Sequence, residues 1–202
     1  MHRFRMVLPL VSRSEGRSTV WALVLLLCGV SAALCAAARP TPEELRALTN
    51  EDLLAAFQNW TPGGYDIPNP YEAEILARGE PMVEFLVRRF DTGQPLPSEF
   101  IWLFGQFGSP RAFPLLVKDY VANPNFRTAI SIGACLPDEG APAALRAALP
   151  DDAALKGLLQ PIYGSRWAPV SALEVEALLE DLTRHLDEIR QDCRKRSIPQ
   201  LG

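Results

Sequence analysis

The sequence predicts an all-α fold: a short α-solenoid of antiparallel helix pairs behind an N-terminal signal segment. Helix-start signals recur along residues 41–196, and no stretch of this range alternates apolar and polar residues as a half-buried strand would. In addition, glycine-any residue-proline tripeptides recur at Gly79, Gly108 and Gly140, each time between two helical patterns. A turn repeated between paired helices is typical of a solenoid, in which each pair buries its apolar face only against its neighbours.

Residues 1–38 are predicted to be an export signal. Arginines precede a nearly unbroken apolar run at residues 20–30, and Ala36-Ala37-Ala38 supplies the small side chains needed for cleavage after Ala38. The alternative is an uncleaved membrane anchor, because the apolar and small residues of 20–38 are long enough to cross a bilayer. Cleavage would place the protein in the periplasm or outside the cell, whereas an intact leader would hold it at the membrane.

The charge of the remaining chain argues against some function classes. The 202 residues carry a formal charge of -4, but residues 39–202 hold 16 basic and 23 acidic residues, hence -7, with His185 as the one histidine. An acidic domain is a poor fit to nucleic-acid binding, so we expect no nucleic-acid partner. A single histidine without a closely spaced Cys or His gives no support for a zinc site, and we expect neither a metal nor another cofactor.

Two cysteines remain once the leader is removed. Cys135 lies in an apolar stretch, where a thiol packs as a small hydrophobic group, whereas Cys193 is surrounded by charged residues near the C-terminus. A disulfide is chemically permitted in an exported domain, but nothing in the sequence requires one. We therefore expect two free thiols.

The N-terminal region, residues 39–69, is predicted to hold two short helices and a loop. Thr41, followed by Pro42 and Glu44, has the pattern of a helix cap, and Thr49 begins a second such pattern. The segment 60–69 is too rich in Gly and Pro to be helical, and Asn69 at its end caps the next helix.

The repeat region is predicted at residues 70–163. Its tripeptides begin at Gly79, Gly108 and Gly140, at spacings of 29 and 32 residues. In each, glycine would take the left-handed conformation that ends a helix, and proline would start the next. Second helices are expected through residues 85–90, 115–120 and 143–149, and first helices through 75–76, 100–104 and 126–136.

A fourth, less regular pair completes the domain and includes the C-terminal capping helix of residues 164–202. Asp151 or Asp152 starts its first helix, and a capping box at residues 171–174 opens one long helix that ends near Arg196. We expect this long helix to bury a single apolar stripe. The stripe comprises Leu173, Ala177, Leu178, Leu182, Leu186 and Ile189.

The repeat region resembles the HEAT-like repeat family. The best match is residues 123–130, which are similar to the family's start of a first helix: a polar turn, an apolar residue with an arginine, then small apolar residues. The resemblance implies an α-solenoid that binds a protein on the surface lined by its second helices. The alternative is an irregular helical bundle in which the three tripeptides coincide by chance.

No catalytic residue can be assigned from the sequence. Close acidic pairs such as Glu72 and Glu74 point in different directions on a helix, or lie where they cap one. The serines lack the Gly-x-Ser-x-Gly setting of a nucleophile elbow.

Two groups of residues are candidate interaction surfaces. Trp60 and Tyr65 flank the Pro/Gly loop, where exposed aromatic side chains often anchor a partner; the alternative is that this loop covers the open end of the stack. Arg88 and Arg89, with Lys118 and Arg127, would form a basic strip, for which the alternative is a solvated helix face. The basic residues 194–196 need no ligand, because cations complement the dipole at a helix end.

The leading functional hypothesis is an exported module that binds or scaffolds a protein partner whose identity the sequence does not specify. One alternative is a membrane-anchored envelope assembly factor with an intact leader. Another is an enzyme whose carboxylates, distant in sequence, converge in a concave pocket. These hypotheses share one fold, and a fold does not fix a function.

Overall fold

The computed structural model of the chain describes residues 39–61, 69–164 and 174–198. The chain divides into two units, Met1–Pro40 and Thr41–Gly202, and the predicted leader with its cleavage site lies outside the described residues.

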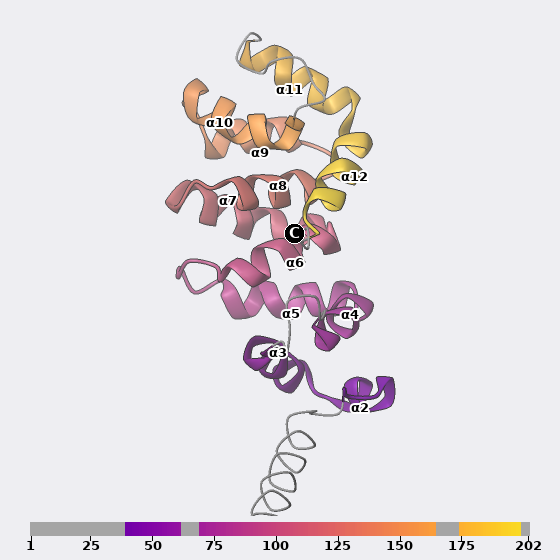
Figure 1. Cartoon of the computed structure of the whole chain (residues 1–202). Coiled ribbons are helices and arrows are strands. Elements are labelled where there is room, and N and C mark those ends of the chain that lie inside the picture. Colours follow the sequence, from indigo (N-terminus) through magenta and orange to yellow (C-terminus); the bar gives the residue numbers. More distant parts are fainter. Residues whose placement is uncertain (1–38, 62–68, 165–173, 199–202) are drawn as a thin grey trace, which may run out of the picture. The chain divides into compact units, whose positions relative to one another are not determined.

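The described part of the second unit is all-helical, as predicted, with eleven α-helices, one 3-10 helix and no strand (Figure 1). None of these helices is long and apolar enough to span a membrane. They are α2 (Pro42–Ala47), α3 (Asn50–Asn59), α4 (Pro70–Ala77), α5 (Glu80–Phe90), α6 (Ser98–Phe107), η1 (Pro110–Ala112), α7 (Phe113–Ala122), α8 (Phe126–Ala134), α9 (Ala141–Ala148), α10 (Asp152–Tyr163), α11 (Val175–Arg184) and α12 (Leu186–Arg196).

The helix starts predicted from caps at Thr41, Thr49, Asn69 and Asp151 are confirmed. The Thr41 hydroxyl accepts a hydrogen bond from the Glu44 backbone N–H, and the Glu44 carboxylate accepts one from the Thr41 N–H at 2.7 Å, so α2 opens on a capping box. The side chains of Thr49, Asn69 and Asp151 cap the N-termini of α3, α4 and α10, respectively. Each accepts a hydrogen bond from a backbone N–H in the first turn of its helix. These caps satisfy backbone donors that the first helical turn leaves unpaired.

The three tripeptide glycines all have positive φ: 58° at Gly79, 61° at Gly108 and 73° at Gly140. Gly108 ends α6 as predicted, and proline follows near the start of the next helix in each case. Gly140 does not end a helix, because α8 stops at Ala134 and a short turn separates the two. Gly108 and Gly140 have the predicted left-handed conformation, whereas Gly79, with ψ -140°, does not, and the helix lengths of the three units also differ.

The helices of the second unit contact one another in two rows. In one row α4, α6, α8 and α10 contact in succession, and in the other η1 joins α5 to α7, which contacts α9, which in turn contacts α11. Figure 1 shows this succession from the magenta to the orange helices. Phe100 of α6 is fully buried and ties three helices together, since its ring lies 5.7 Å from that of Phe57 in α3 and 4.6 Å from that of Phe90 in α5.

The prediction of one long C-terminal helix is wrong. α11 ends at Arg184 and α12 begins at Leu186, with His185 between them at φ -116° and ψ 24°, outside the α-helical region. The break lets each part bury its own apolar residues: α11 packs on α9 and α10, whereas α12 crosses α6, α8 and α10 (Figure 1). Ala177 of the predicted stripe is exposed, and the capping box at 171–174 falls largely outside the described residues.

The charged neighbours of Cys193 in the sequence suggest an exposed position. In the structure Cys193 is instead fully buried where α12 packs on α8. Its thiol donates to the Ile162 carbonyl at 3.4 Å, and that of Cys135 donates to the Phe104 carbonyl at 3.2 Å. Both cysteines are free, as predicted.

Two arginines fasten α12 to the ends of neighbouring helices. Arg190 donates to the Leu136 carbonyl just beyond α8 and to the Asp138 carboxylate at 2.6 Å. Arg196 donates to the Pro161 and Ile162 carbonyls in the last turn of α10. These guanidinium groups satisfy carbonyls that have no partner within their own helix.

Candidate interaction surface

Two exposed apolar side chains meet at one hollow of the domain. Phe126 is 63% exposed and Ile198 is 53% exposed, and together with Trp102 and Ile130 they line a hollow of about 390 Å³. Val121, at 52% exposure, is a further large apolar residue on the surface but does not line this hollow. The grouping matters because single exposed apolar residues are common, whereas clustered ones mark binding sites.

Helices α8 and α6 position Phe126, Ile130 and Trp102. Phe126 is the first residue of α8, directly after Asn125, whose side chain accepts from the Thr128 N–H at 2.9 Å. Ile130 follows four residues later on the same helix face. Trp102 projects from α6 and packs on Phe57 with ring centroids 6.3 Å apart, so this wall of the hollow is formed without a ligand.

Arginines border the same hollow. Arg196 is held by the α10 carbonyls and by Asp192, whose carboxylate accepts from its Nε at 2.7 Å. Arg127, in contrast, is exposed and has no salt bridge or hydrogen bond to any other described side chain. Its guanidinium is therefore available to an anionic group.

Ile198 also lines a second hollow, of about 430 Å³, so the two adjoin. We call them together the Ile198 groove. Its apolar members are Leu76, Trp102, Phe107, Phe126, Ile130 and Ile198, and its arginines are Arg127, Arg194 and Arg196. The one carboxylate in the lining, Glu80, already accepts from Ser109 at 3.0 Å and lies 3.5 Å from Arg111. The groove is consequently cationic in a domain that is acidic as a whole.

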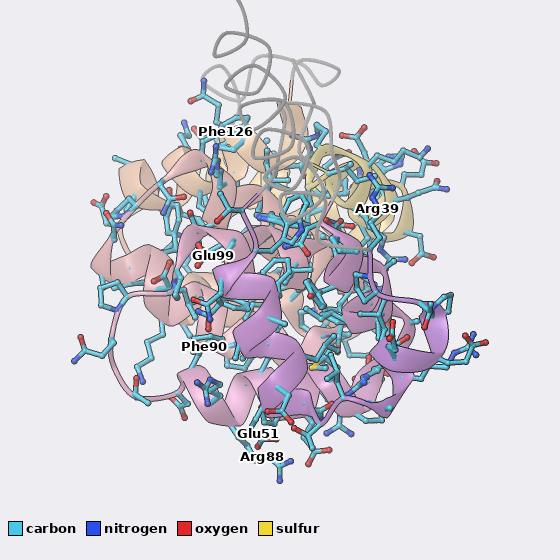
Figure 2. All side chains as sticks on the ribbon, turned by 60° about the horizontal axis from the view of Figure 1, so that its bottom comes forward. Arg39, Glu51, Arg88, Phe90, Glu99 and Phe126 are labelled. Carbon is cyan, nitrogen blue, oxygen red and sulfur yellow. The ribbon has the colours of Figure 1, made fainter. Side chains whose placement is uncertain are left out.

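The residues that the sequence proposed as a site lie elsewhere. Arg88 and Arg89 are exposed in the last turn of α5, and neither has a salt bridge within the described residues. Lys118 is exposed on α7 and pairs with Asp91 at 2.9 Å. Arg127, the fourth member of the expected strip, lines the Ile198 groove instead, and Figure 2 shows Arg88 and Phe126 at opposite sides of the view.

Of the two aromatic residues proposed at the Pro/Gly loop, the structure describes one. Trp60 is half-buried at the C-cap of α3, and Tyr65 lies outside the described residues. Sequence reasoning missed Trp102 and Ile198 as surface residues. It did identify Phe126-Arg127 as the start of a helix. An apolar residue at the first helical position has no preceding helical turn to pack against, so this position could have predicted that Phe126 is exposed.

Reactive groups in the described residues are few. Burial raises the pKa of Cys135 and of Cys193 to about 12, so both thiols stay protonated at neutral pH. Burial also raises the pKa of Glu72, which accepts a 3.5 Å hydrogen bond from Gln106. Within the described ranges no three His, Cys, Asp or Glu side chains are grouped as metal ligands.

Another hollow, of about 680 Å³, lies between α9 and α11 and gathers several carboxylates around Arg146. Arg146 already pairs with Asp152 at 2.5 Å and with Glu176. The Glu176 and Glu180 side chains are 76% and 69% exposed, so water surrounds the acids of this hollow.

No family model matches the chain, and the searches of curated proteins and of solved structures found no significant match. The fold and the groove define its class: an all-α protein with an apolar, arginine-bordered surface groove.

Proposed function

We propose that the chain is an exported HEAT-like repeat protein that acts as a protein-protein interaction or scaffold module. The observation that carries the proposal is the Ile198 groove, where Phe126 and Ile198 are each more than half exposed beside Trp102. Leaving such side chains in water costs about 25 cal/mol per Å² of apolar area that a partner could cover. A clustered apolar surface with a polar border is the composition of protein interfaces.

The two rows of helix contacts support the α-solenoid part of the proposal. Each helix of the row α4, α6, α8, α10 contacts the next, and most units also carry a second helix after a turn with a positive-φ glycine. The interface on this scaffold is proposed on the first-helix row and α12, in place of the second-helix surface that the family resemblance implies.

Export is proposed from the sequence of residues 1–38, with their arginines, apolar run and terminal alanines. N-terminal sequencing of the protein purified from its own cells tests this. A mature chain beginning at Arg39 is expected. An intact Met1 in the membrane fraction would instead favour the anchored form.

Site-specific photocrosslinking in those cells tests the interaction. A photoreactive phenylalanine analogue at position 126 of the full chain should give one discrete crosslinked product, because a partner covers that ring. The same analogue at Val121, a comparably exposed apolar position, and at Arg88 are matched controls. Identical products at all three positions, or none at 126, would contradict the proposed interface.

A further inference from the structure

We infer that the Ile198 groove binds an acidic peptide segment that carries a bulky apolar anchor. This inference rests on the proposed function and specifies the chemistry of the partner. It combines two features of the groove: the open apolar hollow, and the two arginines beside it that have no salt bridge to a described residue.

The size and lining of the hollow determine which apolar side chain the peptide would insert. Its volume of about 390 Å³ lies within the range of small ligand pockets and suits one or two large side chains. Its walls are Trp102, Phe126 and Ile198, and the contact with Phe57 fixes Trp102 in advance. An aromatic or branched aliphatic side chain seated there would cover the two most exposed apolar residues of the groove, and such buried anchors supply most of the affinity at interfaces.

The arginines set the charge of the flanking residues. Arg127 borders one hollow and Arg194 the other, and neither has a salt bridge to a described residue. The Arg194 guanidinium lies directly against Gly108, within 2.6 Å of the position that a Cβ atom there would occupy, and lines the second hollow. A guanidinium binds a carboxylate through paired hydrogen bonds, so Asp or Glu on either side of the anchor would match both arginines. The excess of acidic residues elsewhere on the domain makes this border locally distinct.

A second copy of the chain is a poorer occupant. Pairing two such grooves face to face would bring Arg127 and Arg194 of one copy toward the same arginines of the other. Like charges in contact disfavour that complex. An anionic membrane would match the arginines, but Trp102 and Ile130 line a hollow, whereas insertion into lipid requires apolar side chains that project.

Fluorescence anisotropy with the purified full chain tests the inference. Three labelled peptides of equal length are used: one of Glu, Asp and Ser with a central Phe-Leu pair, one with that pair replaced by Ala-Ala, and one with every acid replaced by Lys. The first should bind, and each change should weaken binding by about tenfold or more. Phe126→Ala and Arg127→Glu should each weaken the first peptide by about tenfold as well.

The matched controls are Val121→Ala, an exposed apolar side chain outside the groove, and Arg88→Glu, an exposed arginine on α5. Both should leave the affinity unchanged. All four variants alter exposed residues and should keep the far-ultraviolet circular dichroism and melting temperature of the parent chain, which checks that any loss is not unfolding.

Several results would overturn the inference. Equal binding of all three peptides, or a loss with Arg88→Glu but not with Phe126→Ala, would place recognition elsewhere. Self-association in sedimentation that Phe126→Ala abolishes would make the occupant a second copy, and co-sedimentation with phosphatidylglycerol vesicles without peptide binding would make it a membrane. Peptide binding only after removal of residues 199–202 would mean that the chain's own end occupies the groove.

Failure here is separable from failure of the proposed function. If the peptides do not bind but the photoreactive analogue at position 126 still yields one discrete product, the interaction module stands and only the partner's chemistry is wrong. If neither is observed, both fail.

Discussion

The Sγ atom of Cys193 in α12 lies 2.5 Å from the position that a Cβ atom on Gly133 of α8 would occupy. Ser197 is the C-cap of α12, and its Oγ atom lies similarly close to the position that a Cβ atom on Gly105 of α6 would occupy. Because both glycines lack a side chain, α12 can approach α6 and α8 closely with small residues of its own. This approach places Ile198, the residue that follows Ser197, in the groove.

Gly133→Ala should therefore destabilise the domain. The added methyl group must displace Cys193, which is fully buried, and overpacking of this kind costs about 1–3 kcal/mol. Urea unfolding followed by circular dichroism measures the loss.

Gly157→Ala is the matched control, since Gly157 lies in α10 and the nearest neighbour of an added Cβ, the Tyr120 hydroxyl, is 3.9 Å away. With no crowding, the higher helix propensity of alanine should stabilise the domain by up to about 1 kcal/mol. If Gly133→Ala is as harmless as Gly157→Ala, the close packing of α12 does not contribute to stability.

Asp119→Ala should cost about 1–3 kcal/mol, because it leaves a buried donor without a partner. Asp119 is 8% exposed and accepts from the Leu96 N–H at 2.9 Å and from the Thr128 hydroxyl at 3.2 Å. The neighbouring Asp91→Ala removes an exposed salt bridge to Lys118 and should cost less than about 1 kcal/mol. Thermal unfolding of the two variants compares them directly, and similar losses would show that burial of Asp119 is not what matters.

Arg78→Ala should loosen α2. The Arg78 side chain donates to the Leu45 and Leu48 carbonyls at 3.1 and 2.9 Å and to the Asn50 side chain at 2.6 Å, and so ties the end of α4 to α2 and α3. Trypsin should then cleave faster after Arg46, an exposed residue in the last turn of α2. Arg88→Ala, which breaks no hydrogen bond or salt bridge among the described residues, should leave that rate unchanged. An unaltered rate in Arg78→Ala would mean that α2 is held by its other contacts.

The thiols should make stability fall at alkaline pH. In the unfolded chain they ionise near 9.0, whereas burial keeps them protonated in the folded domain up to about 12. Above pH 9 the unfolded state therefore binds fewer protons than the folded state, and the free energy of unfolding decreases as pH rises toward 12.

Comparison of the parent chain with Cys135→Ala isolates this effect, since the variant should show a shallower decline above pH 9. Iodoacetamide at pH 8 should also leave Cys135 and Cys193 unmodified in the folded chain and alkylate both in urea, as mass spectrometry of their peptides would detect. Rapid alkylation of the folded chain would contradict the burial of both side chains.

The helix starts were predictable because their causes are local. A cap such as Thr41 with Glu44, or a positive-φ glycine followed by proline, acts through groups within a few residues of each other. For the same reason the all-α class and the starts of α3, α4 and α10 followed from the sequence alone. Phe126 and Arg127 were visible as a helix start, but their joint position at a groove was not.

Only the tertiary structure determines the features that depend on contacts between residues far apart in the chain. The break at His185 arises because α11 and α12 bury their apolar residues against different helices, and the sequence around it contains no Gly or Pro to signal a helix end. Cys193 is buried because Gly133 leaves room for it, 60 residues earlier in the chain. The groove likewise exists because α12 carries Ile198 to Trp102 and Phe126. Local patterns specify where helices begin, whereas packing between distant side chains specifies which of their faces remain open to a partner.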